Sequence, residues 1–293
     1  MTDLVEITQE YVELKGINPK PVFIAVNRLV EVCGSKTVEE YSRKDARDFV
    51  DSYKDVSRFG KVTTTTVRRR LNSLNAVFNY AIYELDLPHR NPFAKIIIKG
   101  EGKDATPREP FSVAELKTLY KQSLSFGKLR LILPILGETG CRLSEVLGLM
   151  REDVTTEDDL LIINIRENDS RGLKTENSKR SLPIVSETAT QALQRLLEAK
   201  TDSPYLFPRY ASCGYLNNTG ASATLCKYLK NSFEGKTAHC LRHSLRDRLR
   251  DCEVPLEALD QIGGWSSVGG VGTNYGKGYS VPKLTDCTGR MVI

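Results

Sequence analysis

Six side chains in the second half of the chain have types that could together act on a phosphodiester. They are two arginines, a lysine, a histidine, an indole and a phenol, and in chain order they are Arg142, Lys174, His239, Arg242, Trp265 and Tyr275. A phenol can attack phosphorus, and the negatively charged phosphorane that forms needs fixed cationic donors on its non-bridging oxygens. The set therefore suits a phosphodiester that is attacked by a tyrosine.

Each of these residues also has a simpler explanation when it is taken alone. Arg142 and Glu145 are one helical turn apart, and such a pair is commonly a surface ion pair that contributes little. Lys174 lies at an expected hairpin tip, where lysine often serves solubility. Trp265 could pack in a core instead of donating its N–H group, and Tyr275 lies in a glycine-rich segment that we expect to be mobile. Alone, none of these positions indicates chemistry.

An expected helix over residues 237–252 carries its basic residues on one face. At 100° per residue they fall within about 100° of arc, opposite a row of leucines, and they are His239, Arg242, His243, Arg246 and Arg250. These cations would repel one another unless something anionic lay against them, which favours a surface that faces phosphate. A solvated cationic face remains the alternative.

A second basic group begins the clearest helix of the N-terminal half. This helix starts in the threonine run 63–66 and carries apolar residues at three-to-four-residue spacing, while its solvent side opens with Arg68, Arg69 and Arg70. Three arginines at a helix start can be a solvated face or can offer phosphate contacts along a duplex. The sequence leaves both explanations open.

The chain is expected to form two domains, because 293 residues exceed what one core usually supports. Residues 1–98 are predicted to be helical, and the polar stretch 99–109 is predicted to be a linker. Ser112 and Glu115 form a capping box where the second domain, residues 110–293, begins its first helix.

The second domain is expected to combine helices with a small antiparallel sheet. Apolar strands are predicted over 160–165 and 180–185, and the polar segment between them suits a hairpin or a three-stranded sheet with Lys174 near the turn. Further helices are expected at 188–199, 237–252 and 255–262.

Composition narrows the classes of function only slightly. The net charge of +5 permits a nucleic-acid partner without demanding one. Seven cysteines form no C-x-x-C pair, so neither a zinc site nor a disulfide framework is indicated. With no apolar run of membrane-spanning length and an acidic N-terminus, we expect a cytoplasmic protein without a membrane partner.

Taken together, the motifs resemble the tyrosine recombinase, or phage integrase, family. The family pattern is an arginine followed three residues later by an acidic residue, a hairpin lysine, H-x-x-R, a histidine or tryptophan after glycine, and then a tyrosine. In this sequence these positions are Arg142, Glu145, Lys174, His239, Arg242, Trp265 and Tyr275. The Ser181-Leu182-Pro183 strand and the region ending in Asn91-Pro92-Phe93 are also similar to that family, so the resemblance covers essentially the whole chain.

The resemblance implies a fold, a reaction and partners. It implies an N-terminal all-α core-binding domain of SAM-like fold, and a C-terminal α+β catalytic domain that is mainly helical with a small antiparallel sheet. The enzyme would cleave and rejoin double-stranded DNA at specific core sites through a 3′-phosphotyrosyl intermediate, as in phage or mobile-element integration and excision. The enzyme would need no cofactor. It would act as a homotetramer in a synaptic complex and could be a monomer when free in solution. It would lie in the cytoplasm, associated with the nucleoid, or in the cytoplasm of a host cell if it is viral.

In this family scheme each matched residue has a role. Tyr275 would be the nucleophile, Arg142 and Arg242 would clamp the non-bridging oxygens, His239 would act as base or donor, and Lys174 would be the general acid. Trp265 would donate to the phosphate, and Glu145 would orient its neighbours. DNA contacts beyond these are expected from Arg68, Arg69, Arg70, His243 and Arg246.

Two departures and three alternatives accompany this interpretation. Trp265 replaces the commoner histidine, and Tyr275 follows it by ten residues where many members have nine, so Tyr279 is a second, weaker candidate for the nucleophile. The alternatives are a DNA-binding protein of this fold that does not cleave, a type IB topoisomerase, and a helical adaptor whose cationic face meets an acidic protein.

Overall fold

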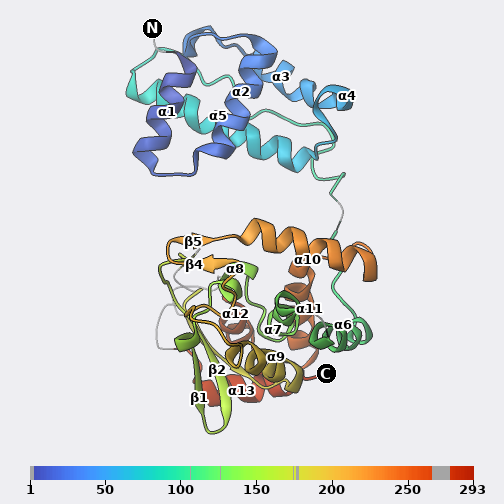
Figure 1. Ribbon diagram of the computed structural model, residues 1–293. Helices are drawn as coiled ribbons and strands as arrows, with labels where there is room; N and C mark the ends of the chain where they lie inside the picture. The colour runs from blue at the N-terminus through green and yellow to red at the C-terminus, as the bar shows by residue number, and fades with distance from the viewer. Residues whose placement is uncertain (1–2, 106, 126, 174, 176–177, 266–277) are drawn as a thin grey trace. The chain divides into compact units, whose positions relative to one another are not determined.

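The computed structural model describes residues 3–105, 107–125, 127–173, 175, 178–265 and 278–293. It divides into two compact units, residues 1–107 and 108–293 (Figure 1). Among the described residues, no helix is both long and apolar enough to cross a membrane.

The first unit is all-helical and contains its own apolar core. Its helices, including two single 3₁₀ turns (η), are α1 (Leu4–Lys15), α2 (Pro19–Cys33), η1 (Val38–Glu40), α3 (Arg43–Asp51), η2 (Ser52–Lys54), α4 (Val56–Phe59) and α5 (Thr64–Glu84). The helix expected from the threonine run is α5, whose N-cap Thr63 accepts a hydrogen bond from the Thr66 backbone N–H. Leu71, Leu74 and Phe78 of α5 are fully buried, as their spacing predicted.

The segment after residue 98, which the sequence predicted to be a linker, is partly attached to the first unit. The Asp104 carboxylate accepts a hydrogen bond of 2.7 Å from the backbone N–H of Thr64, which is an unpaired donor of the first turn of α5. Arg68 forms an ion pair of 2.6 Å with Glu101. The side chains of 101 and 104 thus tie this stretch to the start of α5, and the compact unit ends at residue 107.

The second unit combines helices with two small antiparallel sheets. Its helices are α6 (Val113–Ser125), η3 (Lys128–Leu131), α7 (Ile132–Thr139), α8 (Leu143–Leu147), η4 (Arg151–Asp153), α9 (Glu187–Leu197), α10 (Asn218–Ser232), α11 (Ala238–Asp251), α12 (Leu256–Gly263) and α13 (Val281–Gly289). Its strands are β1 (Val154–Glu157), β2 (Leu160–Ile165), β3 (Arg180–Ile184), β4 (Ala211–Ser212) and β5 (Tyr215–Leu216).

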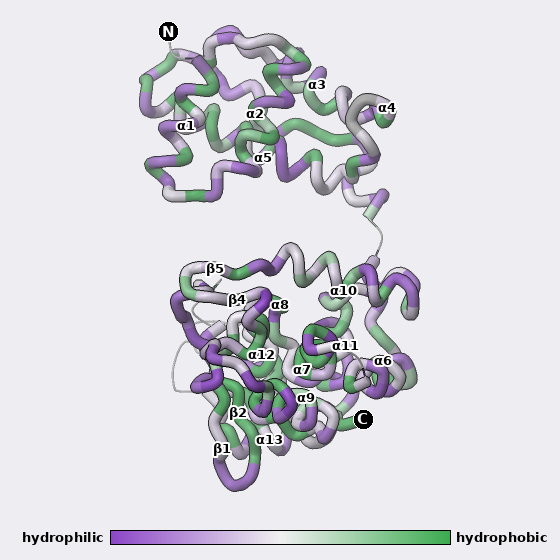
Figure 2. The backbone as a smooth tube through the Cα atoms, in the orientation of Figure 1, coloured by the Kyte–Doolittle hydropathy of each residue, from purple (hydrophilic) through white to green (hydrophobic). Residues whose placement is uncertain are grey.

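The larger sheet has the order β1-β2-β3, which selects the three-stranded alternative over the simple hairpin. In β2 and β3, Ile163 lies opposite Leu182, and both are buried in the main core. The turn between β1 and β2 is hydrophilic, while β2 and the centre of the unit around α7 are apolar (Figure 2). Each predicted strand and helix of this unit begins and ends within two residues of its expected limits.

The helix pair α7 and α11 forms the centre of the second unit (Figure 1). Every residue of α7 is buried, and the leucines 241, 245 and 249 of α11 are fully buried too. Ser112 and Glu115 form the predicted capping box of α6, with hydrogen bonds of 2.7 and 3.3 Å between each side chain and the other's backbone N–H. The core therefore fixes the end of α7 and the face of α11, which carry the residues of interest.

Candidate active site

Residues 140–142 form a sharp turn between α7 and α8. Gly140 ends α7 in the left-handed conformation at φ 62°, and a Cβ atom there would lie 2.4 Å from a methyl carbon of Leu245. Glycine is therefore required both by the backbone and by the close approach of α11. Arg142 is the N-cap of α8, and its backbone N–H donates to the Glu145 carboxylate over 2.9 Å.

Glu145 is a buried carboxylate held between two guanidinium groups. Its two oxygens accept from Arg142 at 2.6 Å and from Arg180 at 3.0 Å. Burial acts to raise the pKa of Glu145, but the charge of Arg180 and the hydrogen bonds from Arg142 outweigh it and keep the pKa below its ordinary value. The carboxylate is thus ionised, and it orients Arg142, as the spacing of the two residues predicted.

Arg180, which the sequence analysis did not single out, is the most connected residue of the cluster. Its side chain is 2% exposed and donates to the Ser178 carbonyl at 2.7 Å, the Ile262 carbonyl at 3.0 Å and the Cys141 sulfur at 3.2 Å, besides Glu145. These bonds join β3 to the turn before α8 and to the end of α12. Arg180 therefore connects β3 to the segment that carries Arg142 and Glu145 and to the helix that precedes Trp265.

A signal for Arg180 was present in the sequence. Side chains alternate across a strand, so position 180 shares a face of β3 with Leu182 and Ile184, and all three are buried. An arginine in such an apolar row requires a buried partner, and the nearest carboxylate is Glu145.

Arg242 and Trp265 are stacked beside this carboxylate. The Arg242 guanidinium lies 4.4 Å from the centre of the indole and donates to the Gly140 carbonyl. Burial, followed by the nearby charges of Arg142 and Arg180, lowers the pKa of Arg242 to about 10. The group is still protonated at neutral pH, in a region where positive charge exceeds negative charge.

The alternative of a solvated cationic face does not describe α11 at two positions. Arg242 is only 7% exposed, because α7 and the indole cover it. The Arg246 guanidinium also lies over the Trp265 ring, 4.6 Å from its centre, and 3.4 Å from the Asp260 carboxylate, so an anion does lie against this face. The helical period gave the direction of each side chain but not the neighbours that meet it.

His239 and His243 lie on the exposed part of the same face. Their rings are 5.1 Å apart and perpendicular. Partial burial first, and then the positive charges of His243, Arg108, Arg242 and Arg142, lower the pKa of His239 below its ordinary value. Its imidazole is therefore neutral at pH 7, the state that a base or an uncharged donor needs.

The structure brings together five of the predicted site residues, which are Arg142, Glu145, His239, Arg242 and Trp265. Lys174 and Tyr275 lie outside the described residues. Tyr279 is described: its backbone N–H and carbonyl both bind the Gln261 side-chain amide, at 2.8 and 3.0 Å. Tyr279 is thus attached to α12 through its backbone.

The three arginines of α5 differ from one another. Arg68 is bound to Glu101 and to the Ile96 carbonyl, at 2.6 and 2.8 Å, so it is not a freely solvated cation. Arg70 lies 5.1 Å over the ring of Tyr53. Arg69 is exposed and is the residue of the three with most freedom to reach a ligand.

The described part of the second unit thus combines an α+β fold, a buried arginine–glutamate cluster and an H-x-x-R helix. Residues 112–279 match the phage integrase family. The match covers more than half of the chain, so the chain belongs to the phage integrase family.

Named relatives and solved structures agree with this assignment. The XerC-like tyrosine recombinase of Caldanaerobacter subterraneus subsp. tengcongensis is 28% identical over 248 residues, which are 74% of this chain and 63% of that protein. The chain therefore spans slightly less than two thirds of that relative. Tyrosine recombinase XerC of Syntrophus aciditrophicus is 27% identical over 230 residues, 71% of this chain and 68% of that protein.

Two solved structures share the fold. One is the Tn1549 transposon integrase in complex with circular intermediate DNA, which is 20% identical with a TM-score of 0.68 over 97% of this chain and 98% of that chain. The other is a lambda integrase dimer bound to a COC′ core site, which is 15% identical with a TM-score of 0.64 over 91% of this chain and 93% of that chain. A two-domain, mainly helical fold with small antiparallel sheets is thus confirmed.

Proposed function

We propose that this chain is a site-specific DNA recombinase that cleaves and rejoins strands through a 3′-phosphotyrosyl intermediate. One observation carries the proposal: the guanidinium groups of Arg142 and Arg180 both bind the carboxylate of Glu145, and the charge of Arg242 lies close to all three. The cluster thus has excess positive charge, held by buried bonds. A phosphorane, with its negative charge on non-bridging oxygens, is the species that such a preorganised site stabilises.

The two proposed phosphate ligands differ in what they can offer. Arg142 is 27% exposed, and its Nη1 is bound to Glu145 and to Ser178 at 2.9 Å, so the far edge of its guanidinium can meet a phosphate oxygen. Arg242 is more buried and is stacked on the indole. The lowered pKa of Arg242 shows that its positive charge is destabilised by burial and by the nearby positive charges. An added anion would stabilise that charge, and the negatively charged transition state is such an anion.

The remaining roles follow the family pattern and are part of the proposal. Tyr275 attacks the phosphorus, Lys174 protonates the leaving 5′-oxygen, and the neutral imidazole of His239 accepts the phenol proton or donates to the phosphate. The Trp265 ring packs against the guanidinium groups of both Arg242 and Arg246. Because the phosphotyrosyl bond conserves the energy of the phosphodiester, ligation needs no further cofactor.

The proposal extends to domains, partners and location. Residues 1–98 would form the core-binding domain and residues 110–293 the catalytic domain, which together hold a duplex at a specific core site. The matched structures are of integrases bound to DNA, and one is a lambda integrase tetramer bound to a Holliday junction. We extend this to a tetramer of this chain in the synaptic complex, acting in the cytoplasm. Arg69, His243 and Arg246 would add contacts to DNA.

A suicide substrate tests the proposed function. The full chain is incubated with duplex DNA that carries a nick next to the cleavage site, in excess chelator, and the products are separated on a denaturing gel. A covalent protein–DNA band is expected, since the cations come from side chains. DNA retention without such a band would instead support the non-cleaving alternative, which the ten-residue interval from Trp265 to Tyr275 favours. Retention without a band would refute the proposed chemistry.

A further inference from the structure

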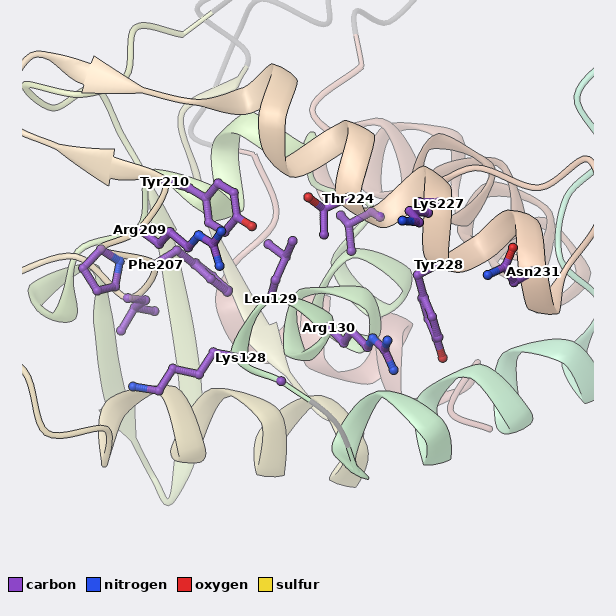
Figure 3. A pocket seen from close by; sticks show the side chains of 14 residues that line it. Lys128, Leu129, Arg130, Phe207, Arg209, Tyr210, Thr224, Lys227, Tyr228 and Asn231 are labelled. Atoms are coloured by element: carbon purple, nitrogen blue, oxygen red, sulfur yellow. The ribbon is translucent and has the colours of Figure 1, made fainter.

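A cavity of about 580 Å³ lies in the second unit, between η3, residues 206–210 and α10 (Figure 3). Its volume is that of pockets which enclose small ligands or anchoring side chains of a partner. None of the residues of the arginine–glutamate cluster lines it. The cavity is therefore a feature separate from the proposed active site, and the strand-transfer chemistry leaves it without a role.

The lining of the cavity is basic. Of its fourteen residues four are cationic and none is acidic, and the cations are Lys128, Arg130, Arg209 and Lys227. Lys128, Arg209 and Lys227 are exposed, and no carboxylate within the described part of the chain forms an ion pair with them. Cations that converge on a hollow without a counter-charge favour an anionic occupant, through attraction that steers the partner and fixes its orientation.

The interior of the cavity is aromatic and partly preformed. The Arg130 guanidinium lies 3.9 Å over the Tyr228 ring, and the Tyr228 hydroxyl donates to the Gln122 side chain over 3.0 Å. In Figure 3 this stacked pair stands on one side of Leu129, and Arg209 and Tyr210 stand on the other. A planar or aliphatic side chain that enters between them meets apolar faces on both sides.

The basic lining and the aromatic interior of the cavity together distinguish between a DNA duplex and a peptide as the occupant. A DNA duplex contacts protein mainly through phosphates at its surface, which side chains that project from a flat or convex surface can reach. These phosphates would not fill the aromatic interior of the cavity. A peptide can supply both an apolar anchor and flanking carboxylates. Anchors of this kind in pockets carry most of the energy of many protein interfaces, surrounded by a polar rim.

We propose that this cavity docks an acidic segment of a partner protein, with an aromatic side chain against the Arg130–Tyr228 stack and carboxylates at Lys128, Arg209 and Lys227. Such a segment binds the catalytic unit away from the arginine–glutamate cluster. The inference does not depend on the proposed chemistry, because it rests on the shape and charge of this surface alone.

The test uses the full chain and a fluorescein-labelled heptapeptide, Asp-Glu-Asp-Trp-Asp-Glu-Asp. Saturable binding is expected by fluorescence anisotropy at low salt, with loss of affinity of about tenfold or more in the Arg209→Glu/Lys227→Glu variant. Lys230→Glu is the matched control, since Lys230 is an exposed lysine of the same helix that does not line the cavity, and it should bind almost as the parent does. Replacing the tryptophan of the peptide by glycine should also weaken binding.

Three results would overturn the proposal. One is the absence of saturable binding, and another is equal weakening in Lys230→Glu and in the double variant, which would show only bulk attraction. The third is displacement of the peptide by duplex DNA together with a matching loss of duplex affinity in the double variant, which would make the cavity part of the DNA interface. Equal thermal midpoints of the variants exclude unfolding as the cause.

Discussion

Replacing Arg180 by methionine should impair cleavage far more than its cost in stability explains. The change keeps the bulk of a long side chain and removes the donors to Glu145, Ser178 and Ile262. Breaking a buried ion pair costs about 3–5 kcal/mol of unfolding free energy. Glu145 keeps its bond to Arg142, so we expect a value near the lower end, about 3 kcal/mol.

The expected effect of Arg180→Met on the cleavage rate follows from the groups that Arg180 holds in place. Without Arg180, the turn before α8 and the end of α12 lose their buried connection and keep only the 3.5 Å contact from Arg142 to the Gly264 carbonyl, so the separation of Arg142 and Trp265 is held less firmly. A shift of about 1 Å in a positioned group can cost about 10²-fold in rate. We expect single-turnover cleavage of a suicide substrate to fall by about that factor while duplex affinity is nearly unchanged. Arg180→Lys should recover part of the rate, because it returns the charge without the planar set of donors.

Arg248→Met is the matched control. The Arg248 side chain is 8% exposed and is paired with Glu138 at 2.8 Å, so its loss breaks a buried pair of similar burial outside the cluster. Urea unfolding should give similar destabilisation for the two variants, whereas the cleavage rate of the folded protein should fall only in Arg180→Met.

The pH dependence separates positioning from simple destabilisation. Arg180 is the strongest influence that lowers the pKa of Glu145, so in Arg180→Met that pKa should rise and the acid limb of the cleavage profile should move to higher pH. Equal rates per folded molecule in the Arg180 and Arg248 variants, with an unmoved acid limb, would refute this reasoning.

Three further predictions concern the proposed site residues His239, Trp265 and Lys174. NMR titration of the free protein should give a pKa of His239 below 6.5, and a value at or above 6.5 would contradict this. Because the unfolded chain then binds the proton more readily than the folded chain, the stability contributed by the neutral ring is complete above pH 6.5. That stability falls as the pH drops towards the pKa of the folded state. Gly263→Ala should displace Trp265, since a Cβ atom at position 263 would lie 1.9 Å from its ring, and should therefore shift the fluorescence emission of this single tryptophan. Gly289→Ala is the control and should leave the emission unchanged, since a Cβ atom there would lie 3.9 Å from its nearest neighbour. Lys174→Ala should slow the cleavage of ordinary DNA by about 10²- to 10⁴-fold. DNA with a sulfur in place of the bridging 5′-oxygen should restore most of the rate, because a thiolate leaves without a proton. Equally slow cleavage of the ordinary and the sulfur-substituted DNA would assign Lys174 to positioning only.

The sequence predicted the elements well because local rules govern them. The apolar spacing of α5, the Ser112–Glu115 capping box and the short apolar runs of β2 and β3 each depend on neighbours along the chain. The pairing of Arg142 with Glu145 was also local, at one helical turn. These predictions needed no knowledge of the tertiary contacts.

The contacts between distant segments could not be predicted in that way. The sequence did not show that Arg242 donates to the Gly140 carbonyl, 102 positions away. Asp260 meets Arg246 from another helix, and Arg68 meets Glu101 from beyond the predicted domain boundary. Charge alone does not show whether an arginine binds phosphate or holds the fold, because a buried guanidinium can do either.

The identity of the nucleophile tests the central claim most directly. The parent chain, Tyr275→Phe and Tyr279→Phe are each incubated with the suicide substrate, and any covalent adduct is digested and mapped by mass spectrometry. We expect a phosphotyrosyl peptide containing Tyr275 in the parent, no adduct with normal duplex retention in Tyr275→Phe, and an adduct in Tyr279→Phe, whose backbone is held by Gln261. An adduct that persists in Tyr275→Phe and is lost in Tyr279→Phe would move the nucleophile, and an adduct in both variants would contradict the tyrosine assignment.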